Sequence, residues 1–119
     1  MKKKLQFGFS DMENKTYAFI KTDKKMIKLF FDDISVIKGL GNYVEIHTKS
    51  DKNYVYYKAL RDLIEKLPAQ FMRIHNSYII NLTNVDYFED NQITLANLKI
   101  TVAKSYRECL LATLNKMLM

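Results

Sequence analysis

Short, strand-like apolar runs, separated by residues that form turns, make up most of the chain. Runs of about four to eight residues bounded by Gly, Asn, Asp or Ser are typical of β-strands. The segment TYAFIKTDKKMIKLFF, residues 16–31, predicts two strands around a turn at residues 22–24. The segment ISVIKGLGNYVEIHT, residues 34–48, predicts another such pair around GLGN at 39–42. Strands joined by short turns pair antiparallel, and no alternation of strands with helices indicates a parallel sheet.

More strands are predicted after these two pairs. They are YVYY (54–57), FMRI (71–74), SYII (77–80), VDYF (85–88), ITLA (93–96) and KITV (99–102). Helical spacing occurs in only two places. In ALRDLIEKL the apolar residues are Leu60, Leu63, Ile64 and Leu67, followed by Pro68, which ends a helix. The prediction is a mainly β fold of short antiparallel sheets, with one short internal helix and a C-terminal helix.

The C-terminal helix is predicted from a one-sided apolar pattern. Ser105 and Glu108 have the S-x-x-E spacing of a capping box, in which the two side chains bond the free N–H groups at a helix start. The residues predicted to share its packed face are Tyr106, Cys109, Leu110, Thr113, Leu114 and Met117.

Length and charge narrow the class of protein. A chain of 119 residues favours one domain, which we expect at residues 17–119 after an N-terminal basic tail or linker at residues 1–16. The lone Cys109 indicates a reducing, cytoplasmic setting, and no apolar run is long enough to span a membrane. The formal net charge of +6 favours an anionic partner, nucleic acid first, although Lys2, Lys3 and Lys4 supply three of those charges.

Catalytic and metal sites are not predicted. His75 and Ser77 are two residues apart, but there is no nucleophile elbow and no acid can be assigned to them. His47, His75 and Cys109 lack the short spacing of metal ligands. We therefore expect no enzyme activity, no metal and no cofactor.

Two features remain as candidate binding surfaces. In FMRIHNSYIIN, residues 71–81, three polar residues stand between apolar runs. Asn76 is suited to a base edge, and His75 can donate to a phosphate or accept from a base, but Asn76 and Ser77 are equally explained as a simple turn. The second feature is an aromatic strand, whose residues Tyr54, Tyr56 and Tyr57 could stack on single-stranded nucleic acid or RNA.

Two other interpretations stay open for these features. The aromatic strand is more simply explained as core on one face and surface on the other. A protein-interaction module that uses exposed strand edges is a further alternative.

The order of the motifs resembles one known family. DDISVIKGLGNYVEIHT, then ALRDLIEKLPAQFMRIHNSYIINLTNV, then ITVAKSYRECL is similar to the LytTR DNA-binding domain of bacterial response regulators. The resemblance runs from about Tyr17 to the C-terminus. Its most specific part is FMRIHNSYIIN, in which the matching residues are Phe71, Arg73, His75, Ser77, Tyr78 and Asn81.

The resemblance implies an elongated β sandwich that contacts double-stranded DNA through loops. Side chains of these loops would enter adjacent major grooves at repeated sites, often with the protein as a homodimer on the DNA. The function implied is transcription regulation, by a standalone regulator or by the output domain of a two-component response regulator. The acidic receiver domain of such a regulator does not fit within 119 residues.

The family's contact positions carry over to three loops. The resemblance implies that Asn42 and Asn76 contact bases and that His75 contacts a phosphate. Lys104 and Ser105 lie where the family has a basic residue at the last helix, but the family's vSRry is VAKSY here, so the expected Arg is absent. Ser105 is then better explained as a helix cap, and Arg107, a turn further on, is a second candidate.

Other matching residues have structural interpretations. Arg73 would contact phosphate, or pair with a carboxylate and hold the sheet. Asn81 is expected to bond nearby backbone, and Tyr43 and Tyr78 are expected to pack.

Overall fold

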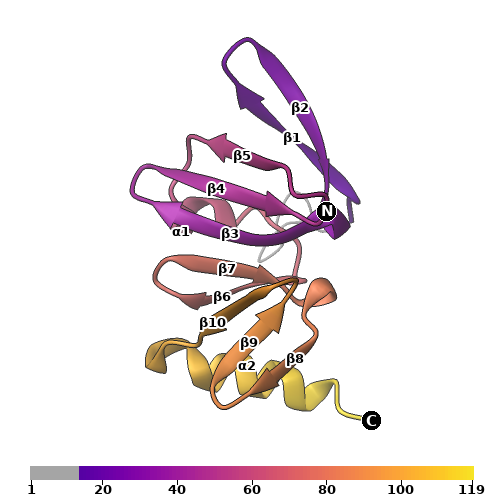
Figure 1. Cartoon of the computed structure of the whole chain (residues 1–119), viewed down its shortest axis with the longest axis vertical. Helices are drawn as coiled ribbons and strands as arrows, with labels where there is room; N and C mark the ends of the chain where they lie inside the picture. Colours follow the sequence, from indigo (N-terminus) through magenta and orange to yellow (C-terminus); the bar gives the residue numbers. More distant parts are fainter. Residues whose placement is uncertain (1–13) are drawn as a thin grey trace, which may run out of the picture.

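Strands dominate the fold of residues 14–119, which a computed structural model describes (Figure 1). Most of the predicted tail at residues 1–16, namely residues 1–13, lies outside the described residues. The strands are β1 Tyr17–Thr22, β2 Lys25–Phe30, β3 Ile34–Leu40, β4 Tyr43–Thr48, β5 Asn53–Tyr56, β6 Phe71–His75, β7 Tyr78–Asn81, β8 Tyr87–Glu89, β9 Gln92–Leu95 and β10 Leu98–Thr101. The helices are α1 Leu60–Ile64 and α2 Lys104–Lys116, and the 3-10 turns are η2 Phe31–Asp33 and η3 Leu82–Asn84.

All strand pairs within residues 14–119 are antiparallel, and they form three sheets. β1 and β2 make a hairpin, β5-β4-β3-β7-β6 make a five-stranded sheet, and β10-β9-β8 make a three-stranded sheet. In Figure 1 the layers run from the hairpin at the top, through the five-stranded sheet, to the three-stranded sheet and α2. The predicted fold class, mainly β with one short internal helix and a C-terminal helix, is confirmed.

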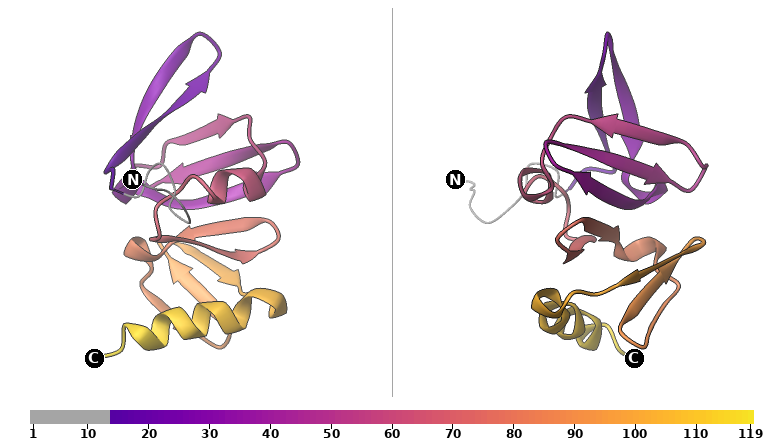
Figure 2. Two further views of the ribbon diagram at one scale, coloured as in Figure 1. Left: turned by 180° about the vertical axis from the view of Figure 1, so that it is seen from behind. Right: turned by 60° about the vertical axis from the view of Figure 1, so that its left-hand side comes forward.

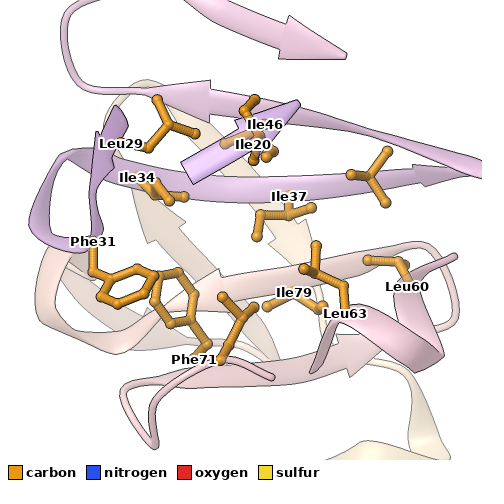
Figure 3. Packing of buried hydrophobic residues seen from close by; sticks show 12 residues of the cluster. Ile20, Leu29, Phe31, Ile34, Ile37, Ile46, Leu60, Leu63, Phe71 and Ile79 are labelled. Carbon is orange, nitrogen blue, oxygen red and sulfur yellow. The ribbon is translucent and has the colours of Figure 1, made fainter. Parts of the chain in front are cut away.

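The central strand β3 separates two apolar cores. Side chains alternate between the faces of a strand, so Ile37 and Ile79 pack on one side while Val36 and Ile80 pack on the other. The first core lies between the hairpin, the five-stranded sheet and α1 (Figure 3). The second is shared with β9, β10 and α2. Burial on both faces fixes the register of β3 against β7, because a slip of one residue would exchange the two faces.

Asn81 ties β7 to the start of β3. Its side chain is fully buried, and its Nδ2 donates to Phe31 O at 2.9 Å and to Ile34 O at 2.8 Å. Its Oδ1 accepts from Gln70 Nε2 at 2.9 Å and from Thr83 N at 3.1 Å. The predicted structural role of Asn81 is confirmed, and its partners reach well beyond the nearby backbone.

Two glycines shape the region around β3 and α1. Gly41, in the turn between β3 and β4, has a φ of +76°, which glycine adopts without strain. A Cβ at Gly39 would lie 2.6 Å from Leu60 Cδ1, so the absence of a side chain lets α1 pack directly against β3.

The details of both helices differ from the prediction. α1 ends at Ile64, before the buried Leu67. In α2 the N-cap is Ala103 and no side chain caps the helix, so the predicted capping role of Ser105 is wrong. The N–H of Ala103 instead donates to Ile74 O at 2.9 Å, and this bond to β6 fixes where the helix begins.

The packed face of α2 is narrower than predicted. Leu110 is its only buried residue; Tyr106 and Leu114, four residues to either side, are partly buried, and so is Thr113. Cys109 and Met117, which were expected on this face, are exposed. The helix packs mainly on β6, and one strand covers only a narrow stripe of a helix.

Candidate nucleic-acid interface

Three segments that are distant in sequence meet along one edge of the molecule. They are the turn at residues 41–42, the turn at residues 76–77, and the first turn of α2. All three lie on the left in Figure 1, and they lie together again in the view from behind in Figure 2. The N–H of Gly39, near the end of β3, donates to Ser77 O at 2.8 Å, which holds the first turn beside the second. The bond from Ala103, at the start of α2, to Ile74 of β6 holds the helix beside the second turn.

An open groove of about 590 Å³ is lined by both turns, by the start of α1 and by Tyr106. Its polar lining residues are Asn42, Arg61, Arg73, Asn76, Ser77 and Tyr106. The described lining holds two arginines and no carboxylate, so the groove favours an anion. Asn42 and Asn76, the two predicted base contacts, are both exposed and both line this groove.

His75 is oriented by its own turn. The backbone N–H of Ser77 donates to His75 Nδ1 at 3.0 Å, and the ring lies edge-on to Tyr78, 5.6 Å between centroids. Because Nδ1 accepts this bond, the neutral ring carries its hydrogen on Nε2. His75 therefore presents a donor, which suits the phosphate contact predicted for it.

Asn76 is held by α2. The hydroxyl of Tyr106 donates to Asn76 Oδ1 at 3.1 Å, across 30 residues of sequence. This bond turns the side-chain oxygen toward the helix and leaves Nδ2 free to face outward.

Arg73 holds the backbone of the same turn. Its Nη2 donates to Asn76 O at 2.7 Å, and its Nε lies 3.4 Å from His75 O. Its guanidinium also lies 5.8 Å from the centre of the Tyr106 ring. Among the described residues its partners are carbonyl oxygens, so the predicted pairing with a carboxylate is wrong. The remaining N–H groups of Arg73 leave its predicted phosphate contact a prediction.

Lys104, Ser105 and Arg107 are all exposed in the first turn of α2. Lys104 and Arg107 are three residues apart and so share one face of the helix. Arg107 can therefore add its charge beside Lys104, in place of the Arg that the family pattern led us to expect.

Sequence reasoning missed Arg61 and the site role of Tyr106. Arg61 is exposed on α1 and lines the groove. A charged residue between the apolar positions of a short helix is expected to face solvent, and this pattern gives no sign of a role in a site. Tyr106 was predicted to pack, and nothing in the sequence indicated that its hydroxyl reaches Asn76.

The aromatic strand does not form a stacking platform. Tyr54 and Tyr56 pack against the first core, whereas Tyr57 is 79% exposed and lies beside Tyr43, 5.7 Å between ring centroids. The interpretation of this strand as core on one face and surface on the other is confirmed. Tyr43 and Tyr78 also make ring contacts, as expected of packing residues.

The fold and the site define a β-rich domain that presents polar and basic residues on turns along one edge. The sequence matches the LytTr DNA-binding domain family over residues 24–115, and the chain belongs to this family, which is one of DNA-binding domains and not of enzymes. No curated protein matches the chain. None of the helices within residues 14–119 is long and apolar enough to cross a membrane.

A solved structure supports the same fold. It is a LytTr DNA-binding domain from Bacillus cereus, from a protein named as a methyl-accepting/DNA response regulator. The TM-score is 0.72 at 18% sequence identity, and the match covers 85% of this chain and 98% of that one. The resemblance inferred from the motifs is thereby confirmed.

Proposed function

We propose that this domain binds specific sequences in double-stranded DNA and regulates transcription. The observation that carries the proposal is the convergence of two exposed turns and the start of α2 on one edge, with a groove along both turns whose lining, among residues 14–119, holds two arginines and no carboxylate. Phosphate contacts supply affinity, and base contacts from exposed polar side chains supply specificity.

The proposal gives each side chain a role. Asn42 and Asn76 contact base edges from the two turns, and His75 donates to a phosphate through Nε2. Arg61, Lys104 and Arg107 supply phosphate affinity, and the exposed Ser105 lies beside Lys104. The family resemblance supports entry of the loops into adjacent major grooves.

The setting in the cell is also part of the proposal. The domain acts in the bacterial cytoplasm, as a standalone regulator or as the output domain of a two-component response regulator. It binds repeated sites as a homodimer on DNA. The family membership supports this setting, since LytTr domains are DNA-binding domains.

Fluorescence anisotropy tests the proposal. A labelled pool of random duplexes and its separate single strands are titrated with protein over a series of salt concentrations. With three cationic phosphate contacts in each domain we expect a slope of log affinity against log salt of about −2.7 for one bound domain, or a loss of about 40-fold between about 50 and about 200 mM salt. We also expect duplex to bind more tightly than either strand.

The other outcomes separate the alternatives. Tighter binding of single strands would favour a stacking mode of binding. No binding of any nucleic acid at low salt would favour a protein-interaction role.

A further inference from the structure

The acceptors of the turn formed by His75, Asn76 and Ser77 point into the protein. Arg73 donates to the carbonyl oxygens of His75 and Asn76, and Gly39 donates to that of Ser77. The two side-chain acceptors, His75 Nδ1 and Asn76 Oδ1, are also occupied, by the N–H of Ser77 and the hydroxyl of Tyr106.

The groups left free on this turn are mainly donors. Among the residues that the structure describes, no acceptor binds His75 Nε2 or Asn76 Nδ2, and neither side chain is buried. Among the side chains of this turn, only the Ser77 hydroxyl can also accept a hydrogen bond. The turn therefore faces outward with hydrogen-bond donors.

We infer that this turn contacts a base as a donor, and that Tyr106 is a positioning residue that sets this polarity by holding Asn76 Oδ1. The inference rests on the proposed function. A bidentate contact to adenine requires Oδ1 to accept from N6–H, whereas guanine offers two acceptors, N7 and O6. Asn76 in this orientation therefore favours guanine over adenine, with cytosine, which offers only a donor, the least favoured.

The position of Tyr106 explains how the polarity is maintained. Its hydroxyl lies on α2, and α2 is anchored to β6 through the backbone bond from Ala103 to Ile74. Its ring is partly buried in the second core. The donor is thus fixed by the fold before DNA arrives, and the exposed amide of Asn76 need not be ordered on binding.

The first test uses the free protein. Tyr106→Phe removes only the hydroxyl and keeps the ring that packs in the core. We expect the side-chain amide NMR signals of Asn76 to move in Tyr106→Phe, with the unfolding temperature unchanged. Tyr87→Phe, a change at an exposed residue of β8, is the matched control and should leave these signals in place. Unmoved signals in Tyr106→Phe would overturn the inference.

The second test selects bound duplexes from a random pool with wild type, Asn76→Ala and Tyr106→Phe. The base that Asn76 contacts is the position whose preference disappears in Asn76→Ala. At that position we expect wild type to prefer guanine over adenine about fivefold or more, and Tyr106→Phe to lower this preference to about twofold or less. In the Asn76→Ala background, Tyr106→Phe should have no further effect.

The outcomes distinguish the inference from the proposed function. A preference for adenine in wild type, or the same preference with and without the hydroxyl, would overturn the inference while leaving sequence-specific binding intact. An enriched motif that Asn76→Ala does not alter would also overturn it. A pool with no enriched motif in wild type would instead overturn the proposed function.

Discussion

Replacing Asn81 by Ala is expected to lower the free energy of unfolding by about 3 kcal/mol. The side chain is fully buried and makes four hydrogen bonds, each of which contributes about 1 kcal/mol net. Ile34 O keeps a bond from Asn84 at 2.9 Å, and Phe31 O keeps one from the N–H of Ile34, so neither carbonyl is left unpaired. Water can replace the bond to the exposed Thr83, so the expected loss of stability is below the roughly 4 kcal/mol of four full bonds.

Urea denaturation followed by circular dichroism measures this loss. Asn97→Ala, in the exposed turn between β9 and β10, is the matched control and should change stability by less than about 0.5 kcal/mol. Asn81→Asp should destabilise more than Ala, because a carboxylate oxygen would face two carbonyl oxygens in a buried site. An Asn81→Ala protein within about 0.5 kcal/mol of wild type would refute the claim that this side chain joins β7 to β3.

Three further predictions concern the groove and its edge. Gly39→Ala should destabilise by about 1 to 3 kcal/mol, because its Cβ would meet Leu60 at 2.6 Å. In a double-mutant cycle measured by thermal unfolding, Gly39→Ala combined with Leu60→Ala should destabilise the protein by less than the sum of the two single mutants. Simple additivity of the two losses would exclude the clash. Asn76→Ala should lower discrimination between cognate and scrambled duplex at least fivefold, by roughly 1 kcal/mol or more, in competition anisotropy; equal losses on both would argue against base contact. Lys104→Ala should weaken both duplexes alike and flatten the salt slope by about 1, and an unchanged slope would remove Lys104 from the phosphate contacts.

The strands and turns were predictable because their signals are local. Alternating apolar residues and turn residues at Asp23 and Gly41 determine each hairpin within a few positions, and the structure places turns at both. The cap at Ser105 was mispredicted because a long-range backbone bond, from Ala103 to Ile74, decides where α2 begins. A local capping signal cannot compete with a helix start that is already set by the sheet.

Most residues at the candidate interface could be predicted from the sequence, but the interactions between them could not. The motif identified Asn42, His75 and Asn76, and the structure brings their turns together. The bond from Tyr106 to Asn76 joins residues 30 positions apart, and no periodicity or spacing encodes it. The position of Arg61 in the groove follows from the packing of α1 on Gly39, which depends on a steric gap that the sequence does not display.

The most direct test of the account is to map which residues meet duplex DNA. The backbone and side-chain NMR signals of the protein are followed as the selected duplex is added. The account predicts that the changes concentrate on the turns at residues 41–42 and 75–77, on Arg61, and on the first turn of α2. Changes that instead concentrate on β5 or on the outer face of the β1–β2 hairpin would contradict it.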